Sequence, residues 1–353
     1  MNKITTLEAT RGFAALLVLL YHATGSMFEY YYGYPTLSWF RFGHAGVEFF
    51  FVLSGFIILY VHREDLGRPH RIQNYTWRRF VRIYPLYWTV TTAMLAAAMV
   101  VPSIGNLPAL HWRSVFYSFL LLHHADYPVV SVAWSLEHEI LFYALFGIAI
   151  LNLRIGAALF VLWAVAIAYS RIMGEQSLLF DFIGRDYNML FFVGMAAAAV
   201  VRRWRIPAPR TILVIGAILF FTGGALEDYG FDLKGFAGRL IYGFGAAGIV
   251  LGLVEAERSR KWRAPRLLML VGAASYAIYL VHLNSLIVIE KTAAVTGLGR
   301  LLPEGVILCL LIMLPICVGL ACHVFFERPV LDFLRQWHPG VRVQRSMAGP
   351  PVA

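Results

Sequence analysis

Residues 7–25 read LEATRGFAALLVLLYHATG, an apolar segment long enough to cross most of a bilayer as a helix. It carries Arg11 near its start and His22 near its end. At about 100° per residue these two side chains lie on nearly one face, separated by about 16 Å along the axis. An arginine and a histidine inside a membrane are costly to expose to lipid. The segment is therefore predicted to face a protein interior or a wet cavity and to mark a functional site.

The composition is that of an integral membrane protein. Of 353 residues, 59% are hydrophobic and only 14% are charged. The net charge of +10 does not indicate a nucleic-acid partner, because the basic residues recur in short clusters between apolar segments, as they do in cytoplasmic loops. The three cysteines all lie in one apolar segment near the end, without the spacing of a disulfide or zinc motif.

The predicted fold is all-α and polytopic, with about ten transmembrane helices. Segments of spanning length occur at residues 7–25, 44–62, 80–101, 132–151, 154–171, 186–201, 210–226, 236–254, 268–290 and 303–326. Arginine-rich connections alternate with acidic and aromatic ones, so the positive-inside rule places both termini in the cytoplasm. We expect one membrane domain over residues 1–330 and a cytoplasmic tail over 331–353.

The predicted topology gives each polar residue a depth. His22 ends the first helix about one turn from the outer surface, and Glu48 in GHAGVEFFFVLSGF lies at a similar depth. Glu139 in AWSLEHEILFY and His282 in SYAIYLVHLNSL also fall in the outer half. Two acids and two histidines at matched depth predict a shared catalytic cluster.

The cytoplasmic end carries a different chemistry. Arg79 and Arg82, three residues apart in WRRFVRIYPLYW, share a helix face at the level of Arg11. Guanidinium groups bind phosphates bidentately, which suits a nucleotide cofactor arriving from the cytoplasm. The distance from these arginines to His22 is comparable to the length of a pantetheine arm, so acyl-coenzyme A is the expected donor.

Simpler interpretations stand beside these. The arginines, Arg78 above all, can act as positive-inside anchors. Either glutamate can be a buried packing group, and His282 can be an interhelical hydrogen bonder. Histidines at positions 111, 123 and 124 lack acids at ligand spacing, so no metal is expected. A transporter or a flippase of a lipid-linked sugar is the alternative class of function, although the chain shows no inverted repeat.

Six blocks of the chain, in order, resemble landmarks of the acyltransferase 3 family of membrane acyltransferases. They are the R-x10-H pair of Arg11 and His22, GHAGVEFFFVLSGF, RRFVRIYPLYW with its R-x-x-R, AWSLEHEILFY, SYAIYLVH and FFERPV. The resemblance runs from the first predicted helix to the last. Among members of one domain, the chain is most similar to exopolysaccharide O-acetyltransferases.

The resemblance implies an enzyme of the bacterial inner membrane that moves an acetyl or other acyl group from cytoplasmic acetyl-CoA to a hydroxyl group. The acceptor is expected to be a cell-surface polysaccharide or an undecaprenyl-linked oligosaccharide, with membrane lipid around the enzyme. His22 is then the catalytic histidine, either as general base or as transient acyl carrier, oriented by Glu48 or Glu139. Arg11, Arg79 and Arg82 are expected to bind the donor.

Three further residues in the same blocks are expected to contact the substrate: His282, Trp134 and Tyr143.

Overall fold

A computed structural model of the chain describes residues 4–27, 29, 33, 36–100, 111–174, 177–259, 264–297 and 301–337. Within these ranges the fold is all-helical and no strand occurs, which confirms the predicted fold class. The α-helices are α1 (Thr5–His22), α3 (Ala45–His62), α4 (Ile72–Val100), α5 (Trp112–Leu120), α6 (Trp134–Leu151), α7 (Leu153–Met173), α8 (Leu178–Ile183), α9 (Met189–Arg203), α10 (Pro209–Asp228), α11 (Phe236–Arg258), α12 (Arg266–Ala273), α13 (Ser275–Thr296), α15 (Glu304–Cys322) and α16 (Arg328–Arg335).

Seven helices in the described ranges are long and apolar enough to cross a membrane, which agrees with a multi-pass membrane protein. They are the helices α3, α4, α6, α7, α10, α11 and α15, the last continuing to the end of α16. An eighth span is formed if the bent pair α12 and α13 is counted as one. The other two predicted spans correspond to α1, which carries Glu8 and Arg11, and to α9, which has only 15 residues.

The predicted span at 268–290 is not one straight helix. It divides at Ala274 into α12 and α13, whose axes differ by 66°. Hydroxyl groups of α13 tie it to its neighbours, since Tyr276 donates to the carbonyl of Ile83 at 2.8 Å and Tyr279 donates to that of Val132 at 3.0 Å. The bend therefore brings the start of α13 against α4 and the segment before α6.

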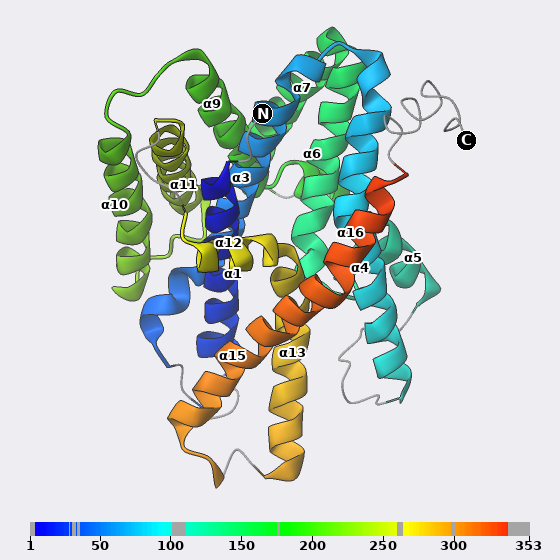
Figure 1. Cartoon of the computed structure of the whole chain (residues 1–353), viewed down its shortest axis with the longest axis vertical. Helices are drawn as coiled ribbons and strands as arrows, with labels where there is room; N and C mark the ends of the chain where they lie inside the picture. Colours follow the sequence, from blue (N-terminus) through cyan, green and yellow to red (C-terminus); the bar gives the residue numbers. More distant parts are fainter. Residues whose placement is uncertain are drawn as a thin grey trace, which may run out of the picture.

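Helix α1 lies at the centre of the bundle, in contact with α3, α11, α12 and α13 (Figure 1). Glycines permit two of these close crossings. A Cβ atom on Gly46 of α3 would lie 2.4 Å from the carbonyl oxygen of Ala14, and one on Gly272 of α12 would lie 1.9 Å from that of Glu8. These crossings fix where the side chains of α1 point.

Two π-helical segments interrupt the regular helices. The first, Ala23–Met27, begins directly after His22, and the second, His323–Glu327, joins α15 to α16. A π-helical turn holds an extra residue, so it rotates the side chains that follow it, and such turns are frequent at functional sites.

The end of the described chain crosses the predicted domain boundary at residue 330, because α16 extends to Arg335. The predicted tail beyond residue 337 lies outside the described residues.

Candidate functional site

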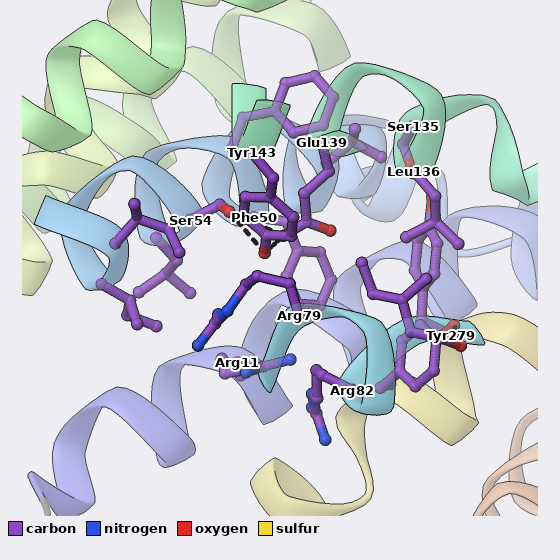
Figure 2. A pocket seen from close by; sticks show the side chains of 17 residues that line it. Arg11, Phe50, Ser54, Arg79, Arg82, Ser135, Leu136, Glu139, Tyr143 and Tyr279 are labelled. Atoms are coloured by element: carbon purple, nitrogen blue, oxygen red, sulfur yellow. Dashed lines mark hydrogen bonds between the residues drawn. The ribbon is translucent and has the colours of Figure 1, made fainter. Parts of the chain in front are cut away.

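A cavity between α1, α3, α4, α6 and α13 gathers the three predicted donor-binding arginines. Arg11 reaches it from α1, and Arg79 and Arg82 reach it from adjacent turns of α4. Figure 2 shows the three guanidinium groups on one side of this cavity and Glu139 and Tyr143 on the other. Sequence spacing therefore identified a set of arginines that the tertiary structure does bring together.

The cavity carries an excess of positive charge. Of the three guanidinium groups, only that of Arg82 forms an ion pair among the described residues, with Glu327 at 2.8 Å. The Nε atoms of Arg11 and Arg79 are buried and have no hydrogen-bond partner in the described part of the chain. Buried donors without partners are rare in folded proteins, so these two atoms point to an anionic or strongly polar ligand.

Glu139 faces the arginines rather than His22. Its carboxylate accepts hydrogen bonds from the hydroxyl of Ser54 at 2.7 Å and from that of Tyr143 (Figure 2). Tyr143 in turn lies under Arg79, whose Cζ is 5.6 Å from the ring centroid. The expected placement of Glu139 beside His22 is therefore wrong. Counting residues from a helix end gives a depth but not the direction of a side chain around its helix, and the side chain of Glu139 points towards Ser54 in the middle of α3.

The two histidines predicted to meet do so. The Nδ1 atom of His22 lies 2.9 Å from the carbonyl oxygen of Val18. The same Nδ1 atom lies 3.3 Å from Nε2 of His282. His282 is completely buried, and its own Nδ1 is 2.6 Å from the carbonyl oxygen of Tyr279.

These contacts determine the tautomers. A carbonyl oxygen can only accept, so the Nδ1 of each ring carries the proton. The single Nδ1–H of His22 is then shared between the carbonyl oxygen of Val18 at 2.9 Å and Nε2 of His282 at 3.3 Å, and the Nε2 of His22 keeps a free lone pair. His22 is half-buried, and its Nε2 has no hydrogen-bond partner among the described residues. This nitrogen is available as a base or a nucleophile.

Glu48 belongs to a separate polar cluster. It is 1% exposed and lies 3.8 Å from Nδ1 of His44, whose Nε2 contacts both carboxylate oxygens of Glu227 at 3.0 Å. The structure does not bring Glu48 to hydrogen-bonding contact with His22. The cluster of Glu48 lies against α10 and α11, where Glu227 and Tyr242 contact His44, whereas His22 faces α13.

Trp134, a predicted substrate contact, stacks at an angle on Tyr187 with ring centroids 5.1 Å apart and meets His138 edge-on at 5.9 Å. It therefore lies on the opposite side of α6 from the arginines' cavity. Tyr143 and Tyr279, by contrast, line that cavity directly. Tyr279 also joins this lining to the histidine pair, because its carbonyl oxygen accepts from Nδ1 of His282 at 2.6 Å while its hydroxyl meets that of Ser135 at 2.8 Å.

A second hollow, of about 470 Å³, opens at the end of the bundle where α1 begins. Arg11 and Arg82 line both this hollow and the inner cavity, so they form the boundary between the two. Arg328 and Arg335 of α16 add two exposed guanidinium groups at its rim.

Several site residues were not predicted from the sequence. Ser54 carries no signal in an apolar helix. Tyr276, in a cation–π contact with Arg82 at 5.4 Å, lies three and six residues before Tyr279 and His282, which is a visible pattern along one helix face. Glu327 was quoted only as part of FFERPV, yet it bridges Arg82 and His323, the latter at 2.7 Å. No group of three side chains suited to a metal ion occurs among the described residues.

Comparison of the chain with known proteins identifies its family. The acyltransferase domain model matches residues 4–322 of the chain. The exopolysaccharide production protein ExoZ of Rhizobium meliloti (strain 1021) is 29% identical over 307 residues, which cover 83% of this chain and 90% of that protein. No solved structure matches the chain significantly. The match includes the helices that carry Arg11, His22, Arg79, Arg82, Glu139 and His282, and the chain belongs to the acyltransferase 3 family of membrane acyltransferases.

Proposed function

We propose that this acyltransferase moves an acyl group, most simply acetyl, from acyl-CoA to a hydroxyl group of a surface polysaccharide or its lipid-linked precursor. The observation that carries this proposal is a cavity lined by three arginines, two of which, Arg11 and Arg79, have a buried Nε with no hydrogen-bond partner among the described residues. The pair His22 and His282 is joined to the lining of this cavity through Tyr279. The name of the relative from Rhizobium meliloti supports an exopolysaccharide as acceptor.

The donor enters from the end of the bundle where α1 begins. Its phosphates bind where the outer hollow meets the mouth of the inner cavity. Arg11 and Arg82 line both spaces there, Arg79 lines the inner one, and Arg328 and Arg335 lie at the outer rim. The narrower cavity beyond is lined by arginines at its mouth and by apolar side chains such as Val47, Leu53 and Ile83 further in. An uncharged pantetheine arm fits such a lining, whereas the phosphates do not pass it.

His22 then acts as general base. Its Nε2 removes the proton from the attacking sugar hydroxyl as the oxygen bonds to the thioester carbon. The carbon–sulfur bond breaks, and the imidazolium returns the proton to the sulfur of CoA, so an ester and free CoA leave. His282 accepts a hydrogen bond from Nδ1 of His22 and so keeps Nε2 unprotonated at the start of each cycle.

Topology adds a direction to the transfer. The arginine-rich connections support an orientation in which α1 begins at the cytoplasmic side of a bacterial inner membrane, where acyl-CoA is made. His22, about 16 Å further along the axis, is then near the outer side, where the polysaccharide is exposed.

The test is a single-turnover assay with purified protein, acetyl-CoA labelled in the acetyl group, and polysaccharide as acceptor. His22→Ala should lose at least about a hundredfold in transfer while it keeps the wild-type level of folded protein. The exposed His70 supplies the control, since His70→Ala should transfer normally. Unchanged transfer by His22→Ala would refute its catalytic role. Label retained on wild-type protein without acceptor would replace the general-base step by an acyl-histidine.

A further inference from the structure

A third hollow, of about 650 Å³, lies at the opposite end of α1 from the arginines' cavity. It is formed where the π-helical segment after His22 meets the segment Ser38–His44 and the end of α10. Its lining is polar and of mixed charge, with three acids, two bases and one phenol: Glu29, Glu227, Asp232, Arg41, Lys234 and Tyr21.

Glu227 lies at the buried floor of this hollow. Its side chain is 8% exposed, and both of its oxygens lie 3.0 Å from Nε2 of His44. Behind His44 stands the fully buried Glu48, so the imidazole is held between two carboxylates. Glu227 is therefore fixed in one orientation by residues of another helix, and the carboxylate is presented to the hollow with little conformational freedom left to lose on binding.

The hollow begins next to the catalytic histidine. Tyr21, which lines it, meets the ring of His22 edge-on at 5.0 Å and that of His44 at 5.7 Å. Thr24, in the turn after His22, lines it as well. A ligand seated on Glu227 thus shares the hollow with Tyr21 and Thr24, which lie one residue before and two residues after His22, and it does not pass through the cavity that the arginines line.

The chemistry of the lining distinguishes its ligand from the donor. The second hollow, at the donor end of the bundle, is lined by four arginines and two acids, Glu8 and Asp332, and so attracts phosphate. Here three acids face two bases, which disfavours a phosphate or an anionic lipid headgroup. Alternating carboxylate, hydroxyl and cationic groups match the donors and acceptors of sugar hydroxyls. Phe231, 61% exposed at the rim, offers an apolar surface for the face of a sugar ring.

We propose that this hollow is the acceptor site, and that it binds a polyhydroxylated saccharide with Glu227 as the principal acceptor of its hydroxyl hydrogens. The inference rests on the proposed function in that it supplies the second substrate of the same reaction. His44 is then a positioning residue for Glu227, and the buried cluster with Glu48 gains a role that the donor and His22 do not give it.

The experiment uses oligosaccharides released from the surface polysaccharide of the host strain after deletion of the gene, which lack the modification. Their equilibrium binding to purified full-length protein is measured by fluorescence anisotropy after end-labelling, without donor, and acyl transfer to them is measured separately. Glu227→Gln keeps the shape but removes the charge, and Asp228→Asn, one residue on and exposed outside the hollow, is the matched control.

Glu227→Gln should weaken oligosaccharide binding and raise the KM for the acceptor at least tenfold, with the KM for acyl-CoA unchanged. Asp228→Asn should match the wild type in both. Ser38→Trp is a second variant: Ser38 is an exposed residue of the lining, so the indole fills the hollow without disturbing the core and should weaken binding similarly.

Each result decides between the two proposals. Wild-type acceptor binding and KM in both Glu227→Gln and Ser38→Trp, or no binding by the wild type, would overturn the acceptor site and leave the acyl transfer standing. Binding that is lost in these variants from a protein that transfers no acyl group would overturn the proposed reaction and leave the saccharide site standing. A higher KM for acyl-CoA in Glu227→Gln would assign the hollow to the donor instead.

Discussion

Arg79 gives the sharpest test of donor binding, because Arg78 beside it is a built-in control. Arg79 lines the inner cavity, and its buried Nε has no hydrogen-bond partner within the described part of the chain. Arg78 is exposed, and its Nε–H donates to Asn74 at 2.8 Å. Lysine keeps the charge but replaces a planar fork of donors by a single ammonium group. Arg79→Lys therefore removes bidentate binding without removing the positive charge.

The magnitude follows from burial. A charge-assisted hydrogen bond contributes about 1.5–3 kcal/mol, and inside the cavity no bulk water replaces the lost partner. At about 1.4 kcal/mol per factor of ten, the KM for acetyl-CoA should rise roughly ten- to hundredfold in Arg79→Lys. In Arg78→Lys it should stay within about twofold of the wild type, as is usual for exposed pairs.

The assay compares two donors, acetyl-CoA and S-acetylpantetheine, which has the same thioester arm but no phosphates. If Arg79 binds phosphate, Arg79→Lys should leave the KM for S-acetylpantetheine nearly unchanged. The increase in KM caused by Arg79→Lys and the increase caused by removing the phosphates of the donor are then strongly non-additive. An equal increase in KM for both donors would refute phosphate binding by Arg79 and assign it to the arm or to the structure of the cavity.

Two further changes test the histidine pair and the packing of α1. His282→Phe should lower kcat only about three- to tenfold with KM unchanged, because Nδ1 of His22 loses its contact with His282 but keeps its hydrogen bond to the carbonyl oxygen of Val18. A loss of kcat as large as that of His22→Ala would mean that His282 takes part in the chemistry itself. Gly272→Ala places a methyl group 1.9 Å from the carbonyl oxygen of Glu8 and should lower the thermal unfolding temperature in detergent, at a cost of about 1–3 kcal/mol. Gly305→Ala should leave the thermal unfolding temperature unchanged, because a Cβ atom there meets no described atom within 4 Å. Equal unfolding temperatures of the two variants would contradict the close helix crossing at Gly272.

The arginine cluster was predictable because its members follow simple helical spacing. Arg79 and Arg82 lie on one helix, and Arg11 shares their level in the membrane, so one coordinate, depth, was enough to bring them together. Depth was not enough for the acids. Glu48 lies against His44 and Glu139 accepts from Ser54, and neither contacts His22 among the described residues. The direction of a side chain around its helix depends on tilt and rotation set by neighbouring helices.

The amino-acid sequence by itself determined that the chain is an all-helical membrane protein with an arginine and a histidine on its first helix. Hydropathy and the cost of intramembrane charge are local properties, so they can be read without knowing which helices touch. Only the tertiary structure decided which groups meet. The 66° bend between α12 and α13 and the π-helical turns beside His22 and Glu327 have no clear period in the sequence. They exist because neighbouring helices satisfy the backbone groups that such irregularities leave free, and those neighbours come from distant parts of the chain.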